Sequence, residues 1–172
     1  MKKCIYIFLG LLIIAAAISF SGCASFANGI KLTLAEKSFS EKADQHNRDV
    51  LNCLRKHDAN SLKKMFSKKT RSTEDLDAQI NAAFDFIDGN IEVTDKTKFN
   101  SYGMQSSTEH GKFVLYVISP TVTGIHTDKG RTYDIVTCEY LVNKYHPNYV
   151  GIMEIDIFAD DGSKCAIGKF LK

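Results

Sequence analysis

The sequence lacks the residues and spacings that identify several common classes of protein. It contains no Trp, only two Pro, and five Cys among 172 residues. No Cys-x-x-Cys pair occurs, and the cysteines and histidines are not grouped at the spacings of zinc sites, so we predict no metal site and no cofactor. An acid, a His and a nucleophile do not follow one another in an order that indicates a catalytic triad, so no catalytic residue is predicted.

Excess charge is also missing from most of the chain. Lys2 and Lys3 account for the whole formal net charge of +2, so the rest of the sequence is electrically balanced. A basic stripe or an acidic tail would point to a charged partner, and the sequence has neither. We therefore predict no binding to nucleic acid.

The N-terminal segment has the layout of an export signal. Lys2 and Lys3 precede an apolar run from Ile5 to Ile18, which leads into Ser19-Phe20-Ser21-Gly22-Cys23. A short basic start, an apolar stretch and small residues before a cleavage point are typical of secretory signals. The alternative is an uncleaved membrane anchor, but the run is shorter than the roughly 18–20 residues of a spanning helix, and Gly10 interrupts it.

The end of this segment resembles the lipobox of bacterial lipoproteins, although Phe20 stands where Leu is usual. In such proteins the chain is cut just before a Cys whose thiol carries a lipid. The resemblance implies a lipoprotein signal peptide over residues 1–22, a lipid on Cys23, and a tether over residues 23–40 that leads to a single domain over residues 41–172. The protein is then expected at the cell membrane, anchored through Cys23 on its outer, extracytoplasmic face.

Three cysteines remain after Cys4 and Cys23 are set aside. Because three is an odd number, Cys53, Cys138 and Cys165 can form at most one disulfide, and at least one thiol stays free. We interpret Cys53 and Cys138 as small apolar core residues. A disulfide between Cys138 and Cys165 remains open, because sequence does not give the Cβ geometry.

The first half of the predicted domain indicates helices. One covers Glu41–Lys56, and a short second helix begins at Asn60 or Ser61. The third begins at Ser72 or Thr73 and ends before Gly89. Its apolar residues recur at helical spacing, namely Leu76, Ile80, Ala83, Phe84 and Ile87.

After Gly89 the sequence is rich in Val, Ile, Tyr, Phe and Thr, which indicates strands separated by short turns. Short connections predict antiparallel pairing of successive strands in a meander. Helices followed by strands predict an α+β domain in which the helices pack on a curved antiparallel sheet. The predicted strands are Ile91–Thr97, Phe99–Gln105, Lys112–Ile125, Thr132–Lys144, Tyr149–Ala159 and Cys165–Phe170.

This order of elements resembles the cone of the nuclear-transport-factor-2-like, or cystatin-like, superfamily. Four segments also resemble an uncharacterised family of lipoproteins from Gram-positive bacteria, a domain of unknown function. The resemblance implies a fold but no activity, since that family has no established function. The segments are Asp75-Leu76-Asp77-Ala78-Gln79-Ile80, Phe84-Asp85-Phe86-Ile87-Asp88-Gly89, Thr127-Asp128-Lys129-Gly130-Arg131-Thr132-Tyr133 and Val150-Gly151-Ile152.

The strands carry acids among apolar residues, and these acids suggest a site. Residues two apart share a face, so Met153, Ile155 and Ile157 are predicted to be core, with Ile152, Glu154 and Asp156 on the other face. Together with Glu139, the last two acids could form a general base or line a pocket. Alternatively, all three line the outer face and pair with Lys144, Lys112 or Arg131. The candidate pocket residues are Phe84, Tyr102, Tyr116, Glu139, Glu154 and Asp156.

These observations favour a membrane-anchored, non-enzymatic domain that binds a small molecule or a protein. One alternative is an enzyme that uses Glu139 or Asp156 inside the cone. Another is an interaction module that forms a homodimer through its open sheet face.

Overall fold

The computed structural model describes the backbone from Lys2 to Phe170 and the side chains of residues 29–100 and 103–170. The side chains of the predicted signal peptide and of Cys23 lie outside the described residues. The chain divides into two compact units, Met1–Lys37 and Ser38–Lys172. Among the residues with described side chains, no helix combines the length and apolar character needed to cross a membrane.

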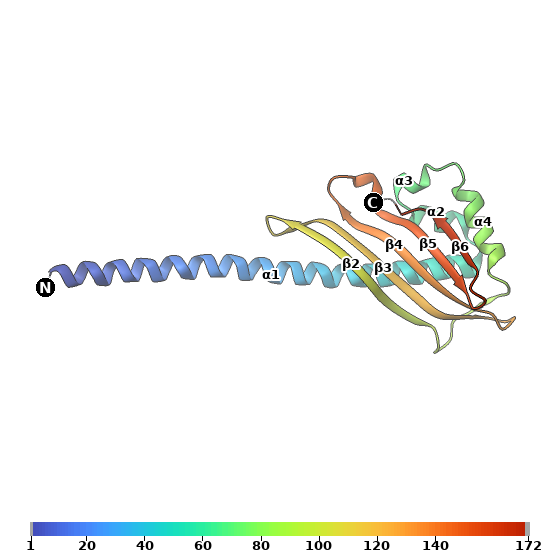
Figure 1. The fold of residues 1–172 in the computed structure, drawn as a ribbon, viewed down its shortest axis with the longest axis horizontal. Helices are drawn as coiled ribbons and strands as arrows, with labels where there is room; N and C mark the ends of the chain where they lie inside the picture. The colour runs from blue at the N-terminus through green and yellow to red at the C-terminus, as the bar shows by residue number, and fades with distance from the viewer. Residues whose placement is uncertain (1, 171–172) are drawn as a thin grey trace. The chain divides into compact units, whose positions relative to one another are not determined.

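Helices and a curled antiparallel sheet form the second unit, which confirms the predicted α+β class (Figure 1). Helix α1 runs from Lys2 to Lys56, so the helix predicted over Glu41–Lys56 is its last part. It ends where His57 takes a left-handed φ of +53°. Asp58, rather than the predicted Asn60 or Ser61, caps α2 (Ala59–Met65) by accepting a hydrogen bond from the Ser61 amide.

The third predicted helix is divided into two. Helix α3 covers Lys68–Arg71, and α4 covers Leu76–Phe86. The predicted start at Ser72 or Thr73 is wrong because their hydroxyls donate back to the carbonyls of Lys69 and Thr70, at 2.7 Å in each case. These residues therefore close α3 instead of capping α4.

The six-stranded sheet has β3 as its central partner. Strands β2 to β6 form the predicted antiparallel meander, while β1 pairs with β3 beyond the end of β2. Because β3 is 16 residues long, it can pair with both. The strands are β1 (Ile91–Glu92), β2 (Lys98–Glu109), β3 (Lys112–Thr127), β4 (Thr132–Asn143), β5 (Gly151–Ala159) and β6 (Lys164–Gly168), with a 3₁₀ turn η1 at Pro147–Tyr149.

Register shifts curl the sheet. Gly103 in β2 and Gly124 in β3 are passed over in the pairing, with φ of +73° and +68°. Further shifts lie between Tyr116 and Val117 and between Cys138 and Glu139. Such bulges increase the local twist and bend a sheet, so the sheet forms a half-barrel around its helices.

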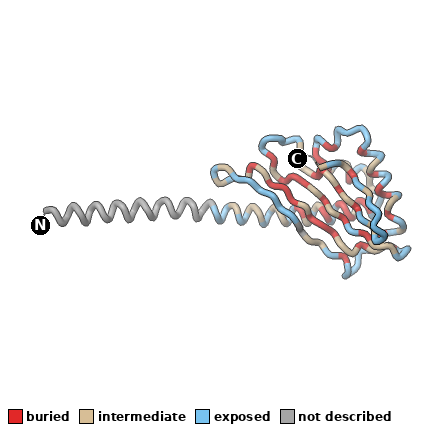
Figure 2. The backbone as a smooth tube through the Cα atoms, in the orientation of Figure 1, coloured by how far each residue is buried: buried red, intermediate tan, exposed pale blue. Residues whose placement is uncertain are grey.

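Buried residues run along the strands of the sheet (Figure 2), and most of them pack against the helices. A main core joins residues of α1, α2 and α4, such as Leu54, Leu62 and Ile80, to Ile135 and Ile155 of the sheet. A second cluster on the same side comprises Ala43, Tyr116, Ile118 and Leu141. An outer cluster on the opposite side comprises Val117, Tyr140 and Met153.

One predicted face assignment is wrong. Alternation placed Met153 with Ile155 and Ile157 and put Ile152 on the other face. The shift opposite Cys138 and Glu139 passes over Met153, so Ile152 joins the main core and Met153 joins the outer cluster. Since side chains alternate with period two, one additional residue is enough to exchange the faces.

Gly151 allows the helices to join the sheet at β5. Phe66 bridges Ile152 in parallel, and the Ser67 amide donates to the Ile152 carbonyl at 2.8 Å. Gly151 has a φ of +117°, and a Cβ there would lie 3.0 Å from the Ser67 nitrogen. The glycine therefore provides both a conformation that other residues avoid and the space for this contact.

Replacing Gly151 by Ala should lower the free energy of unfolding by about 2 kcal/mol, because the new Cβ strains the backbone and presses on Ser67. Gly162→Ala is the matched control, since Gly162 also has a positive φ but open space around its Cβ. Gly162→Ala should lower the free energy of unfolding by only about 1 kcal/mol. Urea denaturation measures both variants, and equal losses would show that the contact with Ser67 adds nothing.

Candidate functional site

Four polar residues form a layer between the two apolar clusters on the helix side of the sheet. On α1, His46 and Asn47 lie between Ala43 of the second cluster and Val50 of the main core. On β4, Thr137 and Glu139 lie between main-core and second-cluster residues in the same way. We call His46, Asn47, Thr137 and Glu139 the polar layer.

A hydrogen bond between Glu139 and His46 joins the two halves of the polar layer. The Glu139 Oε2 lies 2.7 Å from the His46 Nδ1. The Glu139 side chain is 0% exposed, whereas the His46 side chain is 26% exposed. An ionised carboxylate can only accept hydrogen bonds, so His46 then carries its proton on Nδ1. The partly exposed His46 side chain therefore links the buried Glu139 carboxylate to solvent.

The polar layer also contains polar atoms without partners. Asn47 Oδ1, Asn47 Nδ2, Thr137 Oγ1 and Glu139 Oε1 are all buried and have no hydrogen-bond partner within the described part of the chain. Asn47 is 1% exposed, and Thr137 and Glu139 are 0% exposed. Proteins satisfy the large majority of such groups. The layer can therefore offer both donors and acceptors to a guest molecule.

The predicted pocket residues do not lie together. Glu139 belongs to the polar layer, but Phe84 packs in the main core and stacks on His57, with 4.9 Å between ring centroids. Tyr116 packs in the second cluster, 4.6 Å from the Phe39 ring. The backbone of Tyr102 pairs with Ser119, and its side chain lies outside the described residues.

The three predicted acids lie on two faces. Glu154 and Asp156 are on the outer side, opposite Glu139, because they alternate with the core residues Ile155 and Ile157. Asp156 pairs with Lys164 at 2.9 Å, and Glu154 accepts a hydrogen bond from the Phe170 amide. A joint site of all three acids is therefore excluded.

The expected cationic partners of these acids are also wrong. Lys144 pairs with Glu109, and Arg131 pairs with Asp160 and Asp161. The partners of Asp156 and Glu139 are instead Lys164 and His46.

The three thiols are not arranged for redox chemistry. Cys53, Cys138 and Cys165 are free, and Cys53 is a core residue as predicted. Cys138 packs on the outer cluster, whereas Cys165 packs on the main core, so the sheet separates them and the disulfide left open does not form. Burial raises the pKa of the Cys138 thiol, which disfavours the reactive thiolate. Among the described residues, no three His, Cys, Asp or Glu side chains are placed to hold a metal ion.

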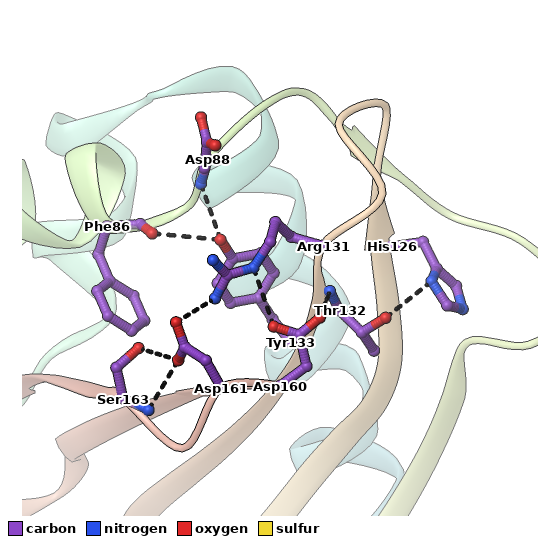
Figure 3. Close-up of polar contacts among 9 residues, drawn as sticks. All are labelled: Phe86, Asp88, His126, Arg131, Thr132, Tyr133, Asp160, Asp161 and Ser163. Carbon is purple, nitrogen blue, oxygen red and sulfur yellow. Dashed lines mark hydrogen bonds and ion pairs between the residues drawn. The ribbon is translucent and has the colours of Figure 1, made fainter.

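A second polar cluster fastens the end of α4 to the β3–β4 hairpin (Figure 3). The Tyr133 hydroxyl accepts from the Asp88 amide at 2.9 Å and donates to the Phe86 carbonyl at 3.3 Å. The Arg131 guanidinium bridges Asp160 at 2.9 Å and Asp161 at 2.7 Å, which ties the hairpin to the β5–β6 turn. We call these six residues and Ser163 the hairpin lock.

The same hairpin is held by the residues that follow α4. The Asp128 carboxylate accepts hydrogen bonds from the backbone and side-chain amides of Asn90, and Lys129 pairs with Asp88 at 2.6 Å. Apart from Asn90, these residues belong to the segments Phe84–Gly89 and Thr127–Tyr133, which the sequence singles out. Their hydrogen bonds are made within the protein, so the segments position the scaffold and do not form the candidate site.

Sequence reasoning missed the α1 half of the polar layer. Neither His46 nor Asn47 is among the pocket residues that the sequence predicts. A signal is nevertheless present, because Ala43, Asn47, Val50, Leu51 and Leu54 recur at helical spacing and all are buried. A lone Asn within an apolar stripe indicates a buried amide that needs a partner.

A family model described as a domain of unknown function (DUF5104) matches residues 49–160, more than half of the chain. The chain therefore belongs to this family. The match includes Thr137, Glu139 and the hairpin of the lock, and it begins just after Asn47. No curated protein matches the chain.

The hairpin lock should make stability depend on pH. Hydrogen bonds from the Ser163 hydroxyl and amide, with a further one from Arg131, lower the pKa of Asp161 to about 2. A folded pKa below the unfolded value gives stabilisation above about pH 4 that is lost as the pH falls toward about 2. Asp161→Asn should therefore lower the melting temperature at neutral pH, and its difference from wild type should shrink below about pH 4.

Ser163→Ala serves as the matched variant, because it removes the hydroxyl that contributes most to the shift while it keeps the carboxylate. The difference in melting temperature between Ser163→Ala and wild type should also shrink on acidification, but over a narrower range of pH. A difference between Asp161→Asn and wild type that stays constant from neutral pH down to about pH 3 would contradict the assignment.

Proposed function

We propose that this DUF5104 domain is a non-enzymatic binding domain that takes up a small polar molecule at the polar layer. The observation that carries this proposal is the presence of four buried, unpartnered polar atoms on Asn47, Thr137 and Glu139. Each unsatisfied buried group costs about 1–3 kcal/mol. A guest that completes their hydrogen bonds would recover this free energy on binding.

The chemistry of the four atoms defines the class of guest. Glu139 Oε1 and Asn47 Oδ1 accept hydrogen bonds, Asn47 Nδ2 donates, and the Thr137 hydroxyl does both. A small molecule with hydroxyl or amide groups matches this set. The second oxygen of Glu139 is already engaged by His46, which fixes the carboxylate in position.

The proposal includes the location of the domain. The lipobox resemblance at Ser21-Gly22-Cys23 supports a lipid on Cys23 and a position on the extracytoplasmic face of the cell membrane. The curled sheet and its helices support the more specific likeness to nuclear-transport-factor-2-like cones, in which the helices and the inner face of the sheet enclose the interior. Membership of the Gram-positive lipoprotein family is proposed on the same grounds.

A second candidate is an enzyme that uses Glu139 as an acid or base. The specific observation in its favour is the 2.7 Å contact with the partly exposed His46, which could exchange protons between Glu139 and solvent. The two candidates differ in one measurable property: a binding domain releases its guest unchanged, whereas an enzyme converts it. Mass analysis of the guest before and after incubation decides between them.

Thr137→Val should raise the free energy of unfolding of the guest-free protein by about 1 kcal/mol, because it removes a buried hydroxyl without a partner. Thr121→Val is the matched control on the neighbouring strand, since that hydroxyl is buried but donates to the Asn100 carbonyl. In the control, the free energy of unfolding should fall by about 1 kcal/mol, because the Asn100 carbonyl loses its hydrogen bond. If Thr137→Val is destabilised as much as the control, a structural partner and not a guest satisfies Thr137.

Native mass spectrometry of the full chain, extracted gently from its own membrane in mild detergent, tests binding directly. The expected result is a monomer with a small additional mass, which Asn47→Leu and Thr137→Val abolish and Thr121→Val retains. A bare monomer in all four proteins would contradict the proposal. A dimer without additional mass would instead support the interaction module.

The proposed anchor is tested on Cys23. In a bacterial host, the wild-type protein should enter the membrane fraction, and its N-terminal peptide should begin at a lipid-modified Cys23. Cys23→Ser should lose the lipid, whereas Cys4→Ser, a matched change inside the predicted signal peptide, should leave lipidation unchanged. An intact wild-type N-terminus that still begins at Met1 would contradict cleavage.

A further inference from the structure

A groove of about 560 Å³ crosses the outer side of the sheet, on the face opposite the polar layer. Its floor consists of strand residues whose side chains point away from the helices. Its walls come from the β4–β5 loop and from the segment after β6. The floor residues are Leu115, Val117 and Tyr140, and the wall residues are Tyr145, His146 and Phe170.

Two stacked pairs of rings occur at this groove; Tyr140, His146 and Phe170 line it, whereas Tyr149 does not. Phe170 stacks on Tyr140, with 5.4 Å between centroids and 12° between planes. His146 stacks on Tyr149, with 5.2 Å between centroids and 26° between planes. The two pairs adjoin each other, since Tyr140 and Tyr149 lie 6.2 Å apart. A groove bordered in this way favours a guest with a flat ring, because offset and edge-to-face contacts between rings are attractive.

The rim is fixed, and its charges are paired within the protein. Glu109 at the end of β2 pairs with Lys144 at 2.7 Å and accepts a hydrogen bond from the Tyr145 hydroxyl. The His146 amide donates to the Asn143 side chain at 2.8 Å, which holds the loop against β4. Because Lys144 and Glu109 neutralise each other, the groove favours an uncharged guest.

We propose that this groove is a second binding site, which takes an uncharged, planar, heteroaromatic ring of nucleobase size. The ring lies against the wall formed by His146 and Phe170, and the side-chain amides of Gln105 and Asn143, which also line the groove, bind its polar edge. The volume is within the range of small-molecule pockets. The site does not depend on the polar layer, because the sheet separates them.

Saturation-transfer NMR on the full chain in lipid nanodiscs tests this site, with empty nanodiscs as the blank. The probes are indole and adenine, and cyclohexanol is the non-planar control. Both planar probes should receive saturation and cyclohexanol should not. His146→Ala and Phe170→Leu should each weaken the affinity for the planar probes about three- to tenfold.

Phe158→Ala is the matched variant. Phe158 is an exposed aromatic residue on β5, lies on the same side of the sheet, and does not line the groove. It should bind both probes as the wild type does. Equal binding of cyclohexanol, or unchanged affinity in both His146→Ala and Phe170→Leu, would overturn the proposal. His146 is exposed, so His146→Ala should keep the wild-type melting temperature and remain informative.

Discussion

The curl of the sheet is the constraint on which the rest of this structure depends. A flat sheet would place residues on its faces by simple alternation, whereas each register shift here exchanges or re-aims the side chains beyond it. The shift opposite Cys138 and Glu139 moves Met153 to the outer side and Ile152 into the main core, whereas Glu139 lies on the helix side by alternation with Ile135 in β4.

The two polar clusters of the domain differ in how completely they are satisfied. In the hairpin lock, every named hydroxyl and carboxylate has a partner, and the pairs are partly exposed, so their net contribution to stability is modest and their effect is mainly geometric. In the polar layer, buried atoms of Asn47, Thr137 and Glu139 remain without partners. Four of the six buried polar atoms without partners among the described residues lie in the polar layer, the other two being Thr127 Oγ1 and Asp156 Oδ1. A concentration of unsatisfied groups in a stable scaffold is typical of a site that gives up stability for binding.

Much of the fold could be predicted from local patterns. The stripe that ends at Ile87 predicts α4, and the β-branched segments after Gly89 predict the meander, because both signals come from residues close together in sequence. The start of α4 could not be predicted, since Ser and Thr hydroxyls can either cap a following helix or close the preceding one. At the site, Glu139 was identified by its apolar neighbours, but its partner His46 lies 93 residues away.

The sequence by itself determined the class of the domain, the order of its elements and the lipobox-like segment at Cys23, because periodicity, turn residues and short motifs are local properties. Only the tertiary structure decided which acids share a face, which residues partner them, and where grooves form. Those features depend on register shifts and on contacts between distant segments, such as α1 with β4 and the β4–β5 loop with the end of β2. A single additional residue in a strand changes them without changing the hydrophobic pattern.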